Sequence, residues 1–537
     1  MLTTDNISLR YGKRVLFEDV NLKFTAGHCY GVIGANGAGK STFLKILSGE
    51  IDPNSGSVHL DKGKRMAVLS QDHFAYDNET VLNTVLQGHS ILWDLMQEKD
   101  TIYAKDPFTD EDGLLAADLE EKFAEMNGWN AESDAGNLLD GLGISTDLHY
   151  RKMDELNGNQ KVRVLLAQAL FGDPDVLLMD EPTNDLDVET ISWLENFLAD
   201  FKNTVLVVSH DRHFLDAVCT NVVDIDFNKI NVFTGNYSFW YHSSQLALRQ
   251  KTDQNKKSEE KKKELQDFIA RFSANAAKSK QATSRKKLLE KLNIEDIKPS
   301  TRRYPAIMFN QERDAGDQII NISNLSAEND EGVLFSNVEF SVNKGDKIAI
   351  ISKNSLAITT FFKTLVEEHP KKTGEVEWGI TINKSYLPND NSKFFDNNLS
   401  LVDWLRQYSD EKDETFIRGF LGKMLFSGEE SLKESNVLSG GEKVRCMFSK
   451  IMLECSNLMI MDEPTNHLDL ESIQALNNGL LDYKGTLLFY SHDHEVINSV
   501  ANRIIEIGPN GMVDKQCTFD EYRNDKSLKE RKSSLYV

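Results

Sequence analysis

Three short motifs occur twice in this sequence, and the distance between the copies is the same for all three. Each second copy begins 282 residues after the first. The pairs are L-N-G-N-Q at 156–160 with L-S-G-G-E at 438–442, D-E-P-T-N-D-L-D at 180–187 with D-E-P-T-N-H-L-D at 462–469, and S-H-D at 209–211 with S-H-D at 491–493. A shared spacing across three motifs indicates two copies of one structural module. Short apolar runs precede the second and third motifs and are typical of buried strands, so each module is expected to be α/β.

The composition excludes several classes of protein. The 537 residues predict three or four domains. No apolar stretch approaches the ~20 residues of a membrane span, and the first residues lack a signal-peptide pattern. Five scattered cysteines without a C-x-x-C pair argue against a disulfide frame, a zinc ribbon or an iron–sulfur cluster, and they favour the cytoplasm. The net charge of −23 disfavours nucleic-acid binding by the chain as a whole.

The first module contains a predicted phosphate-binding loop. The segment G-A-N-G-A-G-K-S-T at 34–42 matches G-x-x-x-x-G-K-[ST], follows an apolar strand and precedes a helical pattern. The glycines allow backbone N–H groups to converge on phosphate oxygens. Lys40 would interact with the β- and γ-phosphates, and Ser41 would ligate Mg²⁺. The nucleotide-binding residues expected from this loop are Gly34, Ala35, Asn36, Gly37, Ala38, Gly39, Lys40, Ser41 and Thr42.

Four further polar residues follow apolar runs that predict buried strands. Asp180 is expected to hold Mg²⁺, and Glu181 is expected to orient or deprotonate the attacking water. His210 would reach the γ-phosphate, and Gln71 would contact the metal and the water. The predicted catalytic residues are Glu181, His210, Gln71 and Lys40, and the predicted metal ligands are Ser41, Gln71 and Asp180.

These motifs resemble the ATP-binding cassette (ABC) family, and the resemblance covers both modules. It implies two α/β P-loop ATPase domains in tandem that pack head to tail. ATP and Mg²⁺ would lie between the phosphate loop of one cassette and the signature motif of the other. L-S-G-G-E at 438–442 resembles that signature, whose helix N-terminus points at the γ-phosphate. Tyr11 resembles the aromatic residue that stacks on adenine. The resemblance adds Tyr11, Ser439, Gly440, Gly441 and Glu442 to the first composite site.

The second composite site departs from the pattern on both of its faces. The aligned loop S-K-N-S-L-A-I-T-T at 352–360 lacks all three glycines, and Ile358 replaces the lysine. An aliphatic side chain cannot make the charge-assisted hydrogen bond, which is worth about 1.5–3 kcal/mol. In the opposing motif Asn157 replaces serine and Asn159 replaces glycine. Asn329 aligns with Tyr11, and either Pro388 or the adjacent Asn389 aligns with Gln71. Asp462, Glu463 and His492 persist as remnants or structural groups. One hydrolytic site is predicted; a second site that still binds nucleotide through its backbone is the alternative.

Two stretches of the chain lie outside the repeat. The phosphate loops are 318 residues apart, so the first module has 36 extra residues, which we place in an acidic, helical arm at about 80–140. From 245 to 303 the net charge is +9, and the pattern predicts two long helices that flank 273–277. The predicted domains are a first cassette at 1–242, a basic helical linker at 243–305, a second cassette at 317–525 and a tail at 526–537.

This layout resembles the ABC-F family: two fused cassettes, an arm in the first and a charged helical linker. Bacterial members are cytosolic translation factors, in which ATP closes the cassettes and permits ribosome binding, and hydrolysis releases the factor. The resemblance implies a monomer whose linker faces tRNA and rRNA, and no DNA partner is expected. Because the arm is acidic, our hypothesis is that it contacts a basic ribosomal protein. The predicted RNA-facing residues are Arg271, Lys278, Lys280, Arg285, Lys286 and Lys287. The alternatives are the ATPase subunit of a membrane transporter, which has no use for the basic linker, and a non-hydrolysing binding protein.

Overall fold

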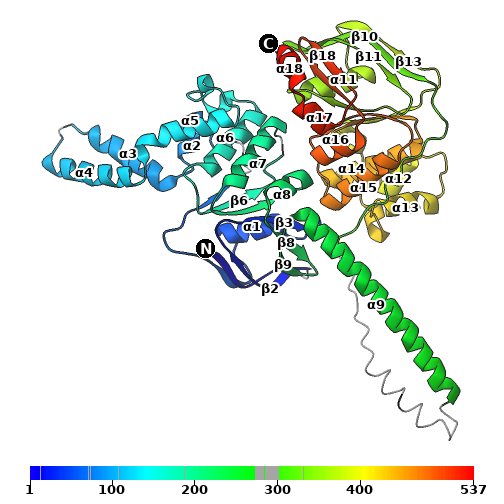
Figure 1. Cartoon of the computed structure of the whole chain (residues 1–537), viewed down its shortest axis with the longest axis horizontal. Helices are drawn as coiled ribbons and strands as arrows, with labels where there is room; N and C mark the ends of the chain where they lie inside the picture. Colours follow the sequence, from blue (N-terminus) through cyan, green and yellow to red (C-terminus); the bar gives the residue numbers. More distant parts are fainter. Residues whose placement is uncertain are drawn as a thin grey trace.

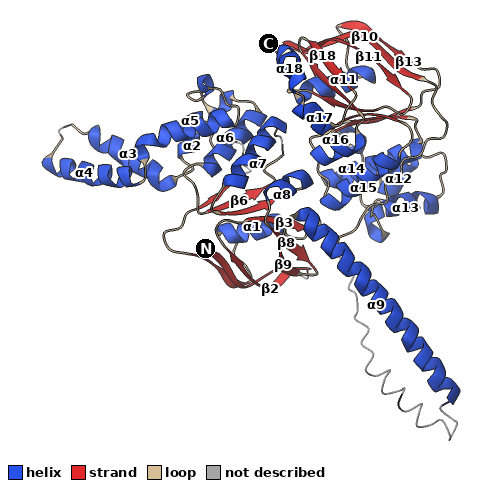
Figure 2. Cartoon of the chain, viewed as in Figure 1, coloured by secondary structure: helices blue, strands red, loops and turns tan. Residues whose placement is uncertain are grey.

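The computed structural model describes residues 1–12, 14–69, 72, 74–106, 108–184, 186, 188–272, 284, 302–329 and 332–536. Within these residues the chain forms two α/β cassettes, a helical arm on the first cassette, and one long helix that extends away from both (Figures 1 and 2). The tandem α/β fold class expected from the sequence is confirmed.

The first cassette contains two sheets within the described residues. Its strands are β1 (Leu2–Tyr11), β2 (Arg14–Phe24), β3 (Cys29–Gly34), β4 (Ser55–Leu60), β5 (Met66–Val68), β6 (Val176–Asp180), β7 (Thr204–Val208), β8 (Asn221–Asp226) and β9 (Lys229–Thr234). A three-stranded antiparallel sheet has the order β2-β1-β4, and a six-stranded sheet has the order β5-β6-β7-β3-β8-β9. In the larger sheet only the β8–β9 pair is antiparallel.

The second cassette repeats this topology strand for strand. Its strands are β10 (Gln318–Asn329), β11 (Gly332–Asn343), β12 (Lys347–Ile351), β13 (Thr373–Trp378), β14 (Lys384–Leu387), β15 (Leu458–Asp462), β16 (Thr486–Tyr490), β17 (Arg503–Gly508) and β18 (Gly511–Lys515). The two sheet orders are β11-β10-β13 and β14-β15-β16-β12-β17-β18. The repeat seen in the sequence therefore corresponds to a repeat of the fold.

Helices cover both faces of the larger sheets. In the first cassette they are α1 (Lys40–Ser48), α2 (Val81–Leu86), α3 (Ser90–Tyr103), α4 (Asp110–Glu125), α5 (Ala131–Gly141), α6 (Gly158–Leu170), α7 (Val188–Asp200) and α8 (Arg212–Val218). In the second they are α11 (Ser355–Leu365), α12 (Leu401–Arg406), α13 (Glu414–Lys423), α14 (Gly440–Glu454), α15 (Leu470–Asp482), α16 (His494–Val500), α17 (Phe519–Asn524) and α18 (Lys529–Ser534).

Strand order places the functional motifs at one edge of the sheet. β3, β6 and β7 are apolar and buried because helices cover both of their faces. They are parallel neighbours, so their carboxyl ends meet, and ligands bind at this edge in open α/β sheets. β3 leads into the phosphate loop, and Asp180 at the end of β6 pairs with Val208 at the end of β7.

The arm and the linker helix project from the first cassette in different directions (Figure 1). α3 and α4 pack side by side in the arm, within the acidic segment expected at about 80–140. The long helix α9 (Tyr237–Phe272) ends directly before residue 273, where the sequence predicted a break. It begins six residues before the predicted linker, because Asn236 caps it and Tyr237 and Trp240 pack into the cassette core.

Of the six residues predicted to face RNA, only Arg271 lies within the described residues. Lys278, Lys280, Arg285, Lys286 and Lys287 lie outside the described residues, as does the predicted second linker helix apart from residue 284. Arg271 lies in the last turn of α9, where the structure describes its backbone. Among the helices of the described ranges, none is both long and apolar enough to cross a membrane.

The two cassettes contact each other beside the ends of their central strands. α8 of the first cassette packs against α16 of the second, and the rings of His213 and His494 lie 4.1 Å apart. Arg523 adds a hydrogen bond from its Nη2 to the hydroxyl of Ser192 at 2.7 Å. Because α8 follows β7 and α16 follows β16, this contact brings the functional edges of both sheets together.

Candidate functional site

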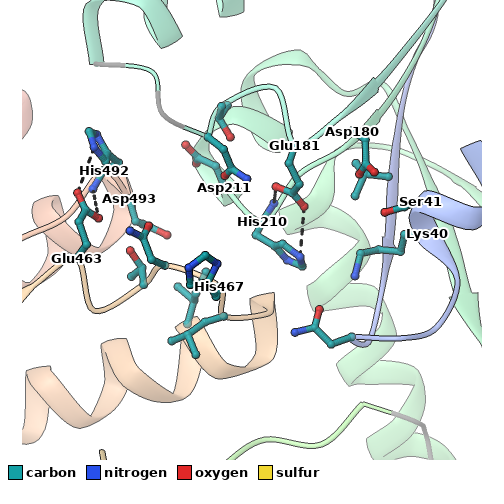
Figure 3. Close-up of a pocket in the computed structure, with 18 of the residues that line it drawn as sticks. Lys40, Ser41, Asp180, Glu181, His210, Asp211, Glu463, His467, His492 and Asp493 are labelled. Atoms are coloured by element: carbon teal, nitrogen blue, oxygen red, sulfur yellow. Dashed lines mark hydrogen bonds and ion pairs between the residues drawn. The ribbon is translucent and has the colours of Figure 1, made fainter. Parts of the chain in front are cut away.

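A cavity of about 530 Å³ lies where the two cassettes meet (Figure 3). Its wall on the first cassette is formed by Asn36, Gly37, Gly39, Lys40, Ser41, Thr42, Asp180, Glu181, Thr183, Asn184, Ile191, Val208, His210 and Asp211. Its wall on the second cassette is formed by Ser355, Asn389, Glu463, Thr465, Asn466, His467, Leu468, Ile473, Tyr490, His492 and Asp493. The cavity therefore belongs to both modules.

The first phosphate loop adopts a conformation that needs glycine. Gly37 and Gly39 have φ angles of 74° and 102°, in the left-handed region that other residues rarely adopt. The loop stays open until α1 begins at Lys40. Inside the loop the N–H of Ala38 donates to the carbonyl of Ala35 at 3.0 Å. This local turn leaves the later N–H groups directed at the cavity, as an anion-binding loop requires.

The Lys40 side chain lies beneath this loop. Its Nζ donates to the carbonyl of Gly34 at 2.9 Å and approaches that of Ala35 at 3.5 Å. The side chain is buried, and burial lowers its pKa, while the negative charge of Glu181 opposes that shift. Lys40 is thus a preorganised cation at the start of a helix, next to the carboxylates at the end of β6.

Glu181 and His210 form a pair that bridges the ends of β6 and β7. The backbone N–H of His210 donates to Glu181 Oε2 at 3.2 Å, and His210 Nε2 lies 3.3 Å from Glu181 Oε1. Burial raises the pKa of Glu181 to about 7 and lowers the pKa of His210 to about 3. At neutral pH the imidazole is therefore uncharged, and the carboxyl is close to the midpoint of its titration. A buried carboxyl near pH 7 has the pKa that a general base needs.

The donor set around the loop fits a magnesium–nucleotide complex. The hydroxyl of Ser41 and the carboxylate of Asp180 both line the cavity, and oxygen ligands are those that Mg²⁺ prefers. Within the described residues no group of three or more His, Cys, Asp or Glu side chains forms a metal cage. Mg²⁺ would thus be held jointly by a few protein oxygens and by phosphate, which is its usual mode of binding.

Some predicted residues of the first site lie away from the cavity. Tyr11, at the end of β1, is 55 % exposed and does not belong to the cavity wall. The signature residues Ser439 to Glu442 cap α14, where Ser439 and Glu442 bond each other's backbone N–H groups. They lie one layer behind His467: a Cβ at Gly441 would come within 2.5 Å of the His467 carbonyl. Gln71 lies outside the described residues.

Other residues that line the cavity were not predicted from the sequence. His467 and Leu468 follow the recognised Asp-Glu pair of the second module, and Asp211 and Asp493 close the repeated Ser-His-Asp motif. Burial raises the pKa of both aspartic acids, and the charge of Asp493 adds to the effect on Asp211. The repeated motifs could have indicated these residues, because each motif continues past the Asp-Glu pair or the histidine that was predicted to be functional.

The second phosphate loop has a different backbone. α11 begins at Ser355, the counterpart of Gly37, so it starts three residues earlier than α1. Ser355 and Ala357 take part in this helix and have no positive φ. Ile358 is fully buried in an apolar core cluster, where the first cassette holds its lysine at the cavity. The extra helical turn uses N–H groups that the first loop leaves open.

A side chain of the same cassette bonds the second loop. The hydroxyl of Tyr536 accepts a hydrogen bond from the N–H of Lys353 at 3.0 Å and donates to Glu506 at 2.9 Å. The Lys353 ammonium lies 5.0 Å from the centre of the Tyr536 ring. Lys353 is the counterpart of Ala35 in the first loop. Tyr536 therefore bonds a backbone N–H group of the second loop and links it to the end of β17.

The other residues of the second site that differ from the ABC pattern have local structural roles or positions in the described residues. Asn157 caps α6 and forms a reciprocal pair of hydrogen bonds with Gln160, and Asn159 accepts a hydrogen bond from Arg163 Nε at 3.1 Å. Asn329 ends β10, where its side chain accepts from the N–H of Gly332. Pro388 follows β14 directly. Asn157 thus caps α6 as Ser439 caps α14, so the helix start of the signature motif is kept although its serine is replaced.

The Glu463–His492 pair of the second cassette has the same geometry as the Glu181–His210 pair of the first. His492 Nε2 lies 3.2 Å from Glu463 Oε1, and the His492 N–H donates to Glu463 Oε2 at 3.3 Å. Burial raises the pKa of Glu463 well above its usual value. Tyr490 also bonds His492, with 2.9 Å between the hydroxyl and Nε2. The strand ends are therefore conserved in shape between the modules, whereas the phosphate loops are not.

The sequence matches known protein families over most of its length. A family profile described as "ABC transporter" matches residues 17–184 and 335–466, and a second profile with the same description matches residues 223–309. The first profile alone covers more than half of the chain. The second begins in β8 and continues through α9.

Three relatives illustrate the similarity. The chain is 59 % identical to a Bacillus subtilis protein named "Uncharacterized ABC transporter ATP-binding protein YkpA", with 100 % of both chains covered. It is 44 % identical to "Probable ATP-binding protein YbiT" of Escherichia coli O157:H7, over 98 % of this chain and 100 % of the relative. It is 30 % identical to "ABC transporter F family member 5" of Arabidopsis thaliana, over 99 % of this chain and 78 % of the relative.

Two solved structures share the tandem architecture. "RNase-L Inhibitor" superposes with a TM-score of 0.62 at 18 % identity, covering 98 % of this chain and 93 % of that chain. An archaeal protein, described as the ribosome recycling factor aABCE1 in complex with the ribosomal stalk protein aP1, superposes with a TM-score of 0.60 at 17 % identity, covering 99 % of each chain. At this identity the likeness shows the fold. The family profile and the sequence relatives establish that the chain belongs to the ABC-F family of tandem ATP-binding cassette proteins.

Proposed function

We propose that this protein is an ATP-dependent, ribosome-binding translation factor with one hydrolytic site. The observation that carries the ATPase proposal is the placement of Lys40, Asp180, Glu181 and His210 around a cavity that the second cassette completes. Three observations support the ribosomal part of the proposal: membership of the ABC-F family, the predicted basic linker, and the fold shared with an archaeal ribosome recycling factor. ATP binding would close the cassettes and favour ribosome binding, and hydrolysis would release the protein.

Each residue of the first site has a role that follows from its position. Magnesium-bound ATP supplies the γ-phosphoryl group and part of the charge that must be neutralised. The loop N–H groups and Lys40 bind the phosphates, while Ser41 and Asp180 hold the metal. Glu181 accepts the proton of the attacking water, and the His210 N–H holds that carboxylate in place. Gln71 would complete the metal and water contacts.

Closure would complete the site from the second cassette. Ser439, Gly440 and Gly441 lie behind His467, at the start of α14, whose N-terminal N–H groups form an anion site. We propose that ATP draws this helix end toward the γ-phosphate and that Tyr11 then stacks on adenine. The head-to-tail contact of α8 with α16 fits this movement, because it places the two functional edges opposite each other.

The second site is proposed to lack hydrolytic activity. The early start of α11, the burial of Ile358 and the Tyr536 contact all reduce the surface available to phosphate. A membrane transporter subunit is the competing function, and it predicts association with membranes instead of ribosomes. The observations favour the translation factor, because α9 extends away from both cassettes, as a linker that reaches into a larger assembly would (Figure 1).

Glu181→Gln is expected to trap the protein on ribosomes in the presence of ATP. Loss of the general base should slow hydrolysis by about 10²–10⁴-fold, while ATP binding persists. We would measure the protein that sediments with ribosomes through a sucrose cushion, with and without ATP. The matched control is Lys40→Ala combined with Glu181→Gln, which should stay in the supernatant. Recovery of Glu181→Gln in the membrane fraction, or its absence from ribosomes, would contradict the proposal.

ATPase activity is expected to rise with pH through about 7. Burial raises the pKa of Glu181 to about 7, and only its deprotonated form can accept a proton. The pKa of His210 is lowered to about 3, so His210 stays neutral above pH 5. Its titration therefore does not change the activity over the measured pH range. The measurement is kcat/KM from pH 5.5 to 9 at saturating Mg²⁺, since this ratio reports the free enzyme. A flat profile over this range would show that Glu181 is not the titrating base.

The Glu181→Gln protein is expected to bind one ATP per chain, as measured by equilibrium dialysis. Adding Lys40→Ala should abolish binding, because the remaining loop lacks the open N–H groups of the first. Adding Ile358→Lys should leave the value at one, since a lysine does not unwind the first turn of α11. Two nucleotides per chain, or one that survives Lys40→Ala, would establish a binding second site.

A further inference from the structure

An arginine connects the first phosphate loop to the small antiparallel sheet. Arg14 begins β2, and its Nη2 donates a hydrogen bond to the carbonyl of Gly37 at 2.7 Å. A Cβ at Gly37 would lie 3.3 Å from the same nitrogen, so the guanidinium packs directly against the loop. Gly37 lines the cavity between the cassettes, whereas Arg14 belongs to neither of its walls. Arg14 therefore contacts the phosphate loop without lining the cavity.

The peptide unit between Gly37 and Ala38 is bonded at both ends. Its carbonyl accepts a hydrogen bond from Arg14, and its N–H donates to the carbonyl of Ala35 at 3.0 Å. The C=O and N–H of a trans peptide unit point in opposite directions, so a rotation of this unit would break both bonds. Gly37 has a φ of 74° and, as a glycine, can adopt many other backbone conformations. Backbone sterics alone therefore do not fix the orientation of this unit.

The orientation of this unit affects what the loop presents to an anion. A rotated unit would turn the carbonyl of Gly37 toward the carbonyl of Ala35, and the turn that now joins Ala35 to Ala38 would open. That turn leaves the later N–H groups of the loop directed at the cavity. Backbone N–H groups attract phosphate, whereas carbonyl oxygens repel it. The Arg14 hydrogen bond therefore favours the loop conformation that can bind phosphate.

Lys40 cannot replace this contact when nucleotide is bound. In the structure, Lys40 Nζ donates to the carbonyl of Gly34 at 2.9 Å and so also holds the loop. In the proposed function the same ammonium interacts with the phosphates, which weakens its bond to the loop. Because Arg14 lies outside the cavity walls, its bond to Gly37 is compatible with bound ATP.

The second cassette lacks this arginine, and its loop uses other contacts. Gly332 is the counterpart of Arg14 at the 318-residue spacing, and the two occupy the same place in the β10–β11 and β1–β2 pairs. The aligned peptide unit lies in the first turn of α11, where the N–H of Leu356 donates to the Asn354 side chain at 3.0 Å. Carbonyls inside a helix are bonded by the N–H four residues on. The arginine thus occurs in the cassette whose loop is open.

We propose that Arg14 is a positioning residue for nucleotide binding at the first site. It holds the peptide unit between Gly37 and Ala38 in the orientation that keeps the phosphate loop open. The proposal rests on the proposed ATPase function of this site, and it adds a residue that the recognised motifs do not include. Arg14 acts through the backbone of the loop, so its loss weakens ATP binding while Glu181 and His210 stay in place.

The first test measures steady-state ATP hydrolysis by the full-length protein and its variants. Arg14→Gln should raise the KM for ATP about tenfold, because the shorter amide cannot replace a hydrogen bond from a charged group. kcat should stay within about threefold, as expected when binding alone is weakened. Arg14→Lys keeps a long cationic donor and should bring KM back toward the wild-type value. The matched control is Arg10→Gln, which removes an exposed arginine from the neighbouring strand β1 and should leave KM within about twofold.

Amide hydrogen exchange, followed by mass spectrometry, tests the effect on the loop without nucleotide. In Arg14→Gln the peptides that cover 34–42 should exchange about tenfold faster than in wild type, because the turn opens more often. The peptides that cover the second loop at 352–360 should exchange at the wild-type rate, since no arginine holds that loop. Arg10→Gln should change the exchange of neither loop.

The two measurements separate failure of the inference from failure of the proposed function. If wild type hydrolyses ATP, the inference is overturned by an Arg14→Gln protein whose KM matches that of Arg10→Gln. A lower kcat with an unchanged KM would also overturn it, because a merely structural role reduces the folded, active fraction. If wild type neither binds nor hydrolyses ATP, the proposed function is rejected. Hydrogen exchange then still decides whether Arg14 holds the loop: faster exchange of 34–42 supports this, and exchange equal to that of Arg10→Gln rejects it.

Discussion

The residue at which a helix begins after the central strand is the constraint that separates the two phosphate loops. The two large sheets have the same strand order, and the Glu–His pairs at their strand ends have nearly the same distances. In the first cassette, glycines keep the loop open until Lys40. In the second, serine and alanine allow the helix to start at Ser355, and Ile358 joins the core. A backbone difference of one helical turn thus separates a nucleotide loop from an ordinary helix start.

Burial is the second physical constraint on the site. The cavity between the cassettes collects lysine, histidine and several carboxyl groups that are largely removed from water, and desolvation is the largest cause of every pKa shift among them. The same burial makes each charge sensitive to its neighbours. Carboxylates of both cassettes therefore oppose the lowering of the Lys40 pKa, with Glu181 as the largest such contribution.

Much of the fold and part of the site were predictable from the sequence. The 282-residue repeat predicted two equivalent modules, and apolar runs before Asp180 and His210 predicted where those side chains lie. Sequence spacing carries no information on how the cassettes pack, so it could not predict that His467 lines the cavity or that the signature lies behind it. Arg302 was only one of many bases in a segment that was interpreted by its net charge. Its ion pairs with three carboxylates that are distant in sequence could not be predicted from that charge.

The strand ends of the second cassette form part of the wall of the cavity that contains Lys40. Glu463 and His492 bond each other, and the carbonyl of Glu463 accepts a hydrogen bond from the N–H of Asn466. Thr465 bonds Ser491 at 2.8 Å, which ties the same loop to the end of β16. That loop then presents His467 to the cavity that contains Lys40. A cassette in which a helix replaces the open phosphate loop can therefore still shape the wall of the site on the other cassette.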